Sequence, residues 1–317
     1  MSNKDYKPTL AQLRTFVTIA DNRHFGTAAN KLGISQPSLS QALVSLESGL
    51  GVQLIERSTR RVIVTAAGLE LLPYARAVLD AAELFIAQAQ GTGGHLTGPL
   101  TIGIIPTVAP FILPELLRVV GEEMSDLEPR IVEDQTSRLI EKLREGRLDV
   151  AMIAIPSDGG ALTEIPLYTE RFVLAVPENH PLAGRKDLHL DALADQDMLL
   201  LDEGHCLRDQ VMSICHAPEL DDAPVHVSTT RAASLATVIQ CVSAGMGITL
   251  LPQSAIPVEG KRPGVALAEF ADDVRAERTI GLAYRTSSNR RNTFNAFAAG
   301  VVEAVDALDL GIATIRR

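Results

Sequence analysis

Two cysteines stand close together in a chain that contains only three, and their spacing suggests thiol chemistry. Leu207, Val211 and Ile214 recur at helical spacing, so the sequence predicts a short helix that begins at Cys206 and ends at Cys215. Such a helix would separate its two ends by about 13 Å, whereas a disulfide needs Cα atoms within about 7 Å. The two sulfurs can therefore bond only if the helix unwinds, which would make thiol oxidation a conformational switch.

The residues around Cys206 act on its thiol in opposite directions. The helix N-terminus, His205 and Arg208 favour the thiolate, which is the form that reacts with peroxides. Three nearby carboxylates oppose this effect: Asp202, Glu203 and Asp209. The spacing is also consistent with two buried, inert cysteines, which are common in cytosolic proteins. The cysteines lack the spacing of a metal site, so we expect no metal.

The composition limits the classes of protein to which the chain can belong. Its length of 317 residues suggests about two domains, and 46% hydrophobic residues suffice for globular cores. No apolar run predicts a membrane span, and the polar N-terminus does not resemble a signal peptide. An odd number of cysteines favours the reducing cytoplasm over a disulfide framework. No dinucleotide-binding, P-loop or GxSxG motif occurs, and no cofactor is expected.

Charge is distributed unevenly along the chain. The net charge is −10, but residues 1–68 carry eight Lys and Arg against four Asp and Glu, a net of +4, which leaves −14 for the remainder. A basic head on an acidic body is typical of a nucleic-acid-binding module fused to a second domain.

The head contains the pattern of a helix–turn–helix. A first helix over residues 10–20 is followed by a turn at Gly33 and a second helix with Ser35 as its N-cap and Pro37 in its first turn. Three leucines form the buried face of that helix: Leu39, Leu43 and Leu46. Short polar side chains then point outward, where they suit base edges and phosphates: Gln36, Ser38, Ser40 and Gln41. The alternative is an ordinary three-helix bundle with a solvated polar face.

A basic hairpin and a long helix follow. Two short strands around a basic tip are predicted over residues 51–65, and such a hairpin beside a helix–turn–helix is a winged helix. We expect Arg57, Arg60 and Arg61 to contact phosphates or the minor groove; otherwise they are solvated surface arginines. The apolar face of the helix predicted over residues 66–90 needs a partner, either a second copy of the chain or its own domain.

Beyond a glycine-rich hinge at residues 91–97, strands and helices alternate. Strands are predicted at residues 100–105, 130–133, 149–155, 171–177, 198–201, 248–252 and 278–285, and helices that end at residues 120, 143, 244 and 308, of which the third begins at residue 229. This is an open α/β pattern, which binds ligands at the carboxyl ends of its strands. Thr107 and Thr136 each follow a strand, so we expect both hydroxyls at one crevice, with Thr136 also capping its helix.

The head resembles that of the LysR-type transcriptional regulators. The match in residues 8–68 is carried by Thr27-Ala28-Ala29, Ser35-Gln36-Pro37-Ser38-Leu39-Ser40, Leu54-Ile55-Glu56-Arg57 and Thr65-Ala66-Ala67-Gly68. The resemblance implies an α+β multidomain protein that binds double-stranded promoter DNA. Its parts would be a winged helix–turn–helix in residues 1–68, a linker and dimerisation helix in 66–90, and a two-lobed, periplasmic-binding-protein-like α/β regulatory domain in 98–317. Thr27, Ser35 and Pro37 join the residues expected at DNA.

One branch of this family senses hydrogen peroxide by thiol oxidation, and the segment from Asp202 to Gln210, followed by Cys215, resembles that branch. Residues 103–108, 244–252 and 278–282 match it as well. The resemblance implies that Cys206 attacks H₂O₂ and that Cys215 then closes a disulfide with it. It implies that seven residues bind or activate the peroxide: Thr107, Val108, Thr136, His205, Leu207, Gln210 and Arg278. The third cysteine, Cys241, is expected in the core.

The resulting hypothesis is a cytoplasmic regulator that is not an enzyme. It would dimerise through the linker helix, assemble into a homotetramer and change its promoter contacts when oxidation repacks the oligomer. RNA polymerase is a candidate partner, a thioredoxin- or glutaredoxin-type reductant would reset the switch, and no membrane is involved. Three alternatives stay open: a LysR-type regulator that binds a small metabolite in the interlobe cleft, a thiol peroxidase, and a nucleoid-type DNA-binding protein.

Overall fold

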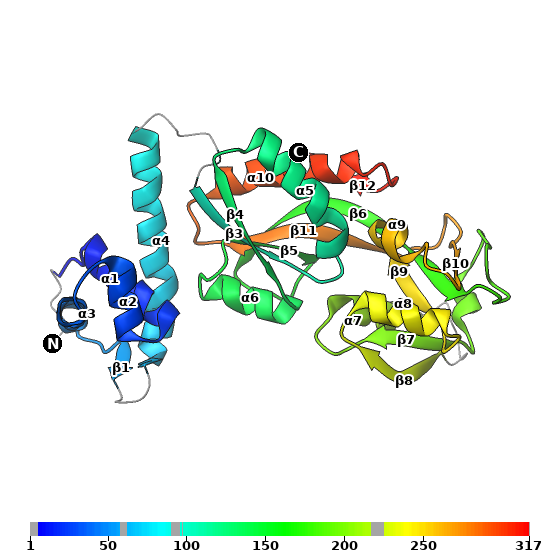
Figure 1. Cartoon of the computed structure of the whole chain (residues 1–317), viewed down its shortest axis with the longest axis horizontal. Coiled ribbons are helices and arrows are strands. Elements are labelled where there is room, and N and C mark those ends of the chain that lie inside the picture. The colour runs from blue at the N-terminus through cyan, green and yellow to red at the C-terminus, as the bar shows by residue number, and fades with distance from the viewer. Residues whose placement is uncertain (1–5, 58–61, 90–95, 97, 217–224, 317) are drawn as a thin grey trace. The chain divides into compact units, whose positions relative to one another are not determined.

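The computed structural model describes residues 6–57, 62–89, 96, 98–216 and 225–316 (Figure 1). The chain forms two compact units. One consists of residues 1–95, 141–149 and 285–293, and the other of residues 96–140, 150–284 and 294–317. Within the described ranges, no helix is both long enough and apolar enough to cross a membrane.

The N-terminal part of the first unit is a winged helix–turn–helix, as predicted. Its elements are α1 (Leu10–Asn22), α2 (Phe25–Leu32), α3 (Gln36–Leu50), β1 (Ile55–Arg57) and β2 (Val62–Val64). Gly33 ends α2 with a φ of 65°, in the left-handed region that favours glycine. Ser35 caps α3, because its hydroxyl accepts a hydrogen bond from the Ser38 amide at 3.3 Å.

The carboxylate of Glu47 attaches the wing, formed by β1 and β2, to helix α3. The strands β1 and β2 pair antiparallel. Glu47 of α3 accepts hydrogen bonds from the backbone amides of Leu54 and Ile55, at 2.8 and 3.0 Å, where the chain enters β1. The wing and α3 are therefore held in a fixed relation at the base of the hairpin.

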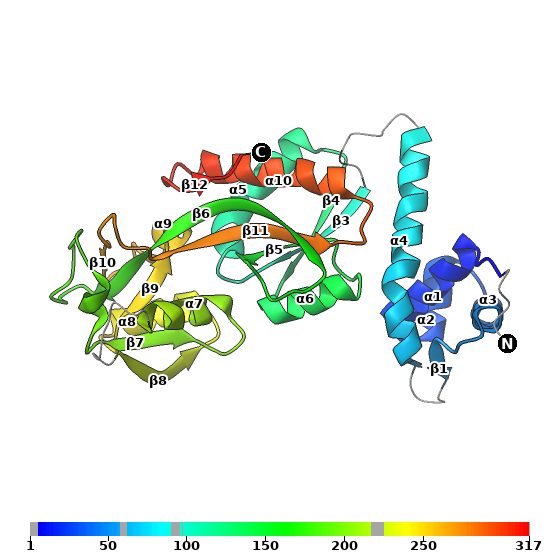
Figure 2. The ribbon, with the colours of Figure 1, turned by 180° about the vertical axis from the view of Figure 1, so that it is seen from behind.

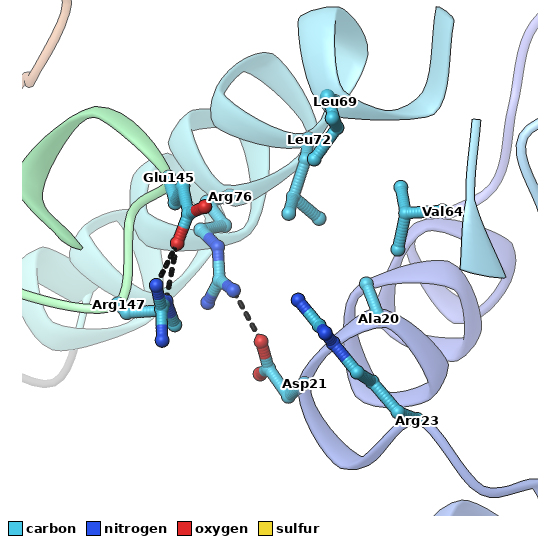
Figure 3. A pocket seen from close by; sticks show the side chains of 9 residues that line it. All are labelled: Ala20, Asp21, Arg23, Val64, Leu69, Leu72, Arg76, Glu145 and Arg147. Atoms are coloured by element: carbon cyan, nitrogen blue, oxygen red, sulfur yellow. Dashed lines mark hydrogen bonds and ion pairs between the residues drawn. The ribbon is translucent and has the colours of Figure 1, made fainter. Parts of the chain in front are cut away.

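The long helix α4 (Ala66–Ala89) begins on the winged helix–turn–helix. Leu72, Ala75 and Leu79 join the buried core of that domain. Arg76 forms an ion pair with Asp21 of α1, and Figure 3 shows the two side chains directed at one another. Farther along the helix the apolar side chains are exposed, with Phe85 at 76%. Part of the apolar face thus packs on its own domain and part of it remains open.

The second unit is built on a mixed sheet. Its strands are β3 (Gly98–Ile104), β4 (Leu127–Glu133), β5 (Val150–Ile155), β6 (Leu162–Pro177), β9 (Thr249–Pro252), β10 (Val265–Ala268), β11 (Glu277–Arg285) and β12 (Ala313–Thr314). The strand order is β10-β6-β11-β5-β3-β4, with β9 and β12 also paired to β6. We call β3, β4 and β5 with their helices α5 (Ala109–Glu123), α6 (Thr136–Arg144) and α10 (Arg291–Ala307) the first lobe.

The second lobe contains the cysteine segment. It comprises β9 and β10, the parallel pair β7 (Asp197–Leu201) and β8 (His226–Ala232), and the helices α7 (Cys206–Cys215), α8 (Leu235–Ser243) and α9 (Ile256–Glu259). Its core includes Leu207, Val211 and Cys215 from α7, and Cys241 packs against it as expected. Figures 1 and 2 show β6 and β11 side by side along both lobes. Near its middle β6 passes from Thr169, paired with β12, to Phe172, paired with β9.

Two predicted elements are wrong in part. The strand expected at residues 171–177 begins at Leu162, because polar residues before Arg171 have partners on β11: Thr169 with Thr279 and Glu170 with Arg278. The helix expected at residues 229–244 is β8 followed by α8. The β-branched residues of β8 favour an extended strand, and Ser234 starts the helix by accepting a hydrogen bond from the Thr237 amide.

The buried face of α3 makes a prediction about stability. Leu43 has no exposed surface, whereas its neighbour Val44 is 39% exposed. We expect Leu43→Ala to lower the free energy of unfolding of the winged helix–turn–helix by about 2–5 kcal/mol, because it leaves a cavity in the core. Urea unfolding followed by circular dichroism measures this, with Val44→Ala as the matched control. Equal losses in the two variants would contradict the assigned face.

Candidate functional site

The predicted cysteine helix is confirmed at both ends. Helix α7 begins at Cys206 and ends at Cys215, and all three cysteines of the chain are free thiols. His205 is the N-cap residue, and its side chain makes no capping hydrogen bond. The N-terminal amides of α7 therefore have no side-chain cap, and the first residue of the helix is Cys206, whose thiol is half-buried.

Cys206 lies in a small pocket at the junction of the two lobes. The space between its atoms is about 150 Å³ with open solvent included, and none of it is wide enough in this structure for a water-sized molecule. It is lined by Ile105, Pro106, Thr107, Gln135, Thr136, His205 and Cys206. These residues come from the loop after β3, the start of α6 and the start of α7. The structure thus brings Thr107 and Thr136 to one pocket with the thiol.

The capping role predicted for Thr136 is wrong. Thr136 is the first residue of α6, and within the described part of the chain its buried hydroxyl has no hydrogen-bond partner. The same holds for the buried side-chain oxygen of Gln210, one turn along α7 from Cys206. Buried polar atoms without partners are costly. Thr136 lines the pocket that contains Cys206, whereas Gln210 is not among the residues that line it.

Arg278 fixes Thr107. Both side chains are buried, and Arg278 donates from one terminal nitrogen to the Thr107 hydroxyl and from the other to the Thr107 carbonyl, at 2.9 Å in each case. Because a guanidinium can only donate, the Thr107 oxygen accepts in this contact. Its own hydrogen is therefore free to be donated elsewhere, and Thr107 lines the pocket that contains Cys206.

The charge of Arg278 is balanced by a buried carboxylate. Glu170 of β6 lies 2.8 Å from Arg278, and neither side chain has exposed surface. Burial disfavours the cation, but Glu170, together with the weaker electrostatic effects of Cys206 and Tyr168, outweighs burial, so the pKa of Arg278 is raised above its ordinary value. Arg278 thus acts as one half of a buried ion pair.

Two further basic side chains lie near the Cys206 thiol, those of His205 and Arg208. Burial lowers the pKa of His205, partly offset by Asp202, so the imidazole is neutral at pH 7. Arg208, expected to favour the thiolate, is 3.3 Å from the carboxylate of Glu203 and is partly neutralised there. At the other end of α7, burial raises the pKa of Cys215 from 9.0 to about 11. The two thiols of one helix thus differ sharply in environment.

Apolar side chains and one glycine complete the surroundings. Val108 and Leu207 are buried beside Thr107 and Cys206. Gly204 has a φ of 91°, and a Cβ there would meet the side-chain oxygen of Gln135 at 2.6 Å. Gln135 also donates to the carbonyl of Glu203 at 3.1 Å, which ties the loop before Cys206 to the first lobe.

Sequence reasoning missed Gln135 and Glu170. Gln135 directly precedes Thr136 at the carboxyl end of β4, which is the position that had indicated Thr136. Glu170 was signalled only by its charge within a strand that is otherwise largely buried.

The residues expected at DNA lie on one helix–turn–helix. Thr27, Gln36, Pro37, Ser38 and Gln41 are exposed, and Ser40 is half-buried. Ser35 is also exposed and is engaged as the cap of α3. Arg60 and Arg61 lie outside the described residues, as does the side chain of Arg57.

Two family models match the chain. One, described as a bacterial regulatory helix-turn-helix protein of the lysR family, matches residues 10–69, and the other, the LysR substrate binding domain, matches residues 93–306. The chain belongs to the LysR family. A relative from Mycobacterium avium, called a probable hydrogen peroxide-inducible genes activator, is 50% identical over 307 residues, which are 97% of each chain.

Two solved structures extend the comparison within the LysR family. One is an OxyR from Corynebacterium glutamicum with a cysteine-to-serine substitution and H₂O₂ bound; it is 59% identical, covers 97% of this chain and 96% of that one, and has a TM-score of 0.68. The other is a full-length OxyR variant from Pseudomonas aeruginosa, 33% identical over 93% of this chain and 95% of that one, with a TM-score of 0.80. This LysR-family chain therefore belongs to the OxyR group.

The burial of Cys215 predicts unequal thiol reactivity. With a pKa of about 11, only about one Cys215 thiol in a thousand is ionised at pH 8, and iodoacetamide attacks the thiolate. In the reduced native protein we expect Cys215 to be alkylated about 100-fold more slowly than in the urea-unfolded chain. Mass spectrometry of the alkylated peptides measures both rates, and Cys206 is the internal control. A native Cys215 rate equal to the unfolded rate would contradict its burial.

Proposed function

We propose that this LysR-family protein is a transcriptional regulator that senses H₂O₂ through Cys206. One observation carries the proposal: the half-buried thiol at the start of α7 shares a pocket with the Thr107 hydroxyl, which Arg278 holds in place. The H₂O₂-bound OxyR relative adds support from a homologous chain.

The pocket suits the first chemical step. The Cys206 thiolate attacks one peroxide oxygen, so that an S–O bond forms and the O–O bond breaks. Sulfur is oxidised to a sulfenic acid, peroxide is reduced, and the departing hydroxide takes up a proton to become water. The Thr107 hydroxyl can donate to the oxygen on which charge develops, and the unpaired hydroxyl oxygen of Thr136, which lines the same pocket, can accept a peroxide hydrogen.

The second step needs a change of structure. Cys215 attacks the Cys206 sulfenic acid, which forms the S–S bond and releases the oxygen as water. Because α7 separates the two residues, the helix must unwind, and Cys215 must leave the core of the second lobe, where it is held as a thiol. Oxidation therefore rearranges a segment that packs on β7 and within the second lobe.

The rearranged lobe would then alter the assembly. In the proposal, the protein acts in the cytoplasm as a homotetramer built from two dimers, each of which forms through the open face of α4. Repacking of the regulatory domains changes the spacing of the helix–turn–helix domains on promoter DNA. A thioredoxin- or glutaredoxin-type dithiol restores the reduced state, RNA polymerase is the candidate partner, and the protein turns over no substrate.

Peroxide titration of the reduced full-length protein tests this function. After about one equivalent of H₂O₂, peptide mapping should find a Cys206–Cys215 disulfide. DNase footprints on a promoter that the protein binds should differ between the two redox states. If both thiols remain alkylatable while DNA binding persists, the signal is a cleft-binding metabolite instead. Continuous consumption of peroxide with a dithiol reductant, without a change in footprint, would indicate a peroxidase.

The role of the Thr107 hydroxyl makes a separate prediction. Thr107→Val keeps the shape of the side chain but removes the donor, and we expect it to slow oxidation of Cys206 by about 100-fold. Thr107→Ser keeps the hydroxyl and should stay within about three-fold of the wild-type rate. The loss of free Cys206 thiol after timed H₂O₂ exposure gives the rates. A Val variant as fast as the Ser variant would exclude a part for the hydroxyl.

A further inference from the structure

A buried acid lies behind the thiol pocket without a part in the reaction described above. Glu170 and Arg278 form an ion pair in which neither side chain has exposed surface. Removing two charges from water is costly, and apolar residues of similar volume often serve stability as well or better. The presence of Glu170 in the middle of β6 therefore calls for an explanation other than stability alone.

Both oxygens of Glu170 are engaged. One accepts from the Nε of Arg278 at 2.9 Å, and the other accepts from the backbone amide of Ser254 at 2.8 Å. Ser254 follows β9 in the second lobe, whereas Thr107, the other partner of Arg278, follows β3 in the first lobe. Thr107, Arg278, Glu170 and Ser254 thus form a continuous chain of hydrogen bonds from one lobe to the other.

This chain of contacts bears on the thiol because the pocket is assembled from both lobes. Cys206 belongs to the second lobe, and the Thr107 hydroxyl belongs to the first. Their relative position therefore depends on how the lobes are tied together. Glu170 lies between Thr169, paired with β12, and Phe172, paired with β9, where β6 passes from one lobe to the next.

Other buried hydroxyls could accept hydrogen bonds from Arg278 if Glu170 were replaced. Within the described residues, the buried hydroxyls of Tyr168 and Ser254 have no hydrogen-bond partner. Tyr168 lies two residues from Glu170 on the same face of β6 and interacts electrostatically with Arg278. A guanidinium without its carboxylate would leave two donors unpaired in a buried site, so rotation toward these hydroxyls and away from Thr107 would be favoured.

We propose that Glu170 is a positioning residue of the thiol pocket, which holds Arg278 on Thr107 and so aims the Thr107 hydroxyl at the peroxide. The inference rests on the proposed function, because the aim of that hydroxyl matters only if Cys206 reacts with H₂O₂. Among the described residues, Glu170 forms hydrogen bonds with Arg278 and the Ser254 amide, and neither of these lines the pocket.

The test compares two reactions of Cys206 in the full-length reduced protein. Glu170→Gln removes the charge and places a donor against either Arg278 or the Ser254 amide. We expect the rate with H₂O₂ to fall about 10- to 100-fold, because a misplacement of about 1 Å at a reacting site can cost about 100-fold. The rate with iodoacetamide, which needs a thiolate but no Thr107 donor, should change by less than about three-fold. A general loss of structure would alter both rates together.

A matched acid on the same strand is the control. Glu164 also lies on β6 and accepts hydrogen bonds from the amide and hydroxyl of Ser157, away from Arg278. Glu164→Gln should leave both rates within about two-fold of wild type. An equal, selective loss of peroxide reactivity in Glu164→Gln and Glu170→Gln would overturn the assignment.

A second variant keeps the inference testable if Glu170→Gln does not fold. Glu170→Met combined with Arg278→Met replaces the ion pair by apolar side chains, which buried sites often tolerate. It should also slow the reaction with H₂O₂, and adding Thr107→Val should slow that reaction by less than about three-fold more, because Thr107 is no longer aimed. Full additivity of Thr107→Val would overturn the inference.

The two proposals fail in different ways. A wild-type peroxide rate no higher than that of free cysteine would overturn the proposed function and this inference with it. A fast wild type with an unaltered Glu170→Gln variant would overturn only the role of Glu170.

Discussion

The ion pair between Glu170 and Arg278 is the contact on which the site depends. It lies where β6 and β11 run side by side, and its hydrogen bonds reach the ends of strands in both lobes. Because both charges are fully buried, neither can move without leaving the other uncompensated, which is strongly unfavourable. The pair therefore fixes the position of Arg278, and the hydrogen bonds from Arg278 hold the loop that carries Thr107.

The other half of the site is a helix that can change. Cys206 is held by the start of α7, by the left-handed turn at Gly204 and by the hydrogen bond from Gln135 to Glu203. The hydrogen bond from Gln135 is exposed, whereas the hydrogen bonds behind Thr107 form a buried network. The site thus combines Thr107, held by a buried network, with α7, which has fewer such contacts. This arrangement is expected when a chemical reaction must cause a conformational change.

The sequence predicted best what local patterns control. The limits of α7 follow from apolar residues at helical spacing and a turn before Cys206, and the meeting of Thr107 with Thr136 follows from the carboxyl ends of parallel strands. Glu170 could not be assigned, because its partner Arg278 is 108 residues away and only the folded sheet brings them together. The start of β6 was missed for a related reason: its polar residues are satisfied by neighbours that no local pattern reveals.

The packing of α7 also bears on how easily a disulfide could be reversed. Unwinding the helix exposes Leu207 and Val211, both about 2% exposed in the reduced state, at about 1.5–3 kcal/mol each. For a two-electron couple, about 1.4 kcal/mol corresponds to about 30 mV. The cost of opening α7 would thus raise the reduction potential by about 60–130 mV relative to an unstrained disulfide. Under the proposed mechanism, a Cys206–Cys215 bond that displaces a packed helix would for that reason be more oxidising and more readily reduced by a dithiol, so the helix that separates the thiols would favour the reversal of their oxidation.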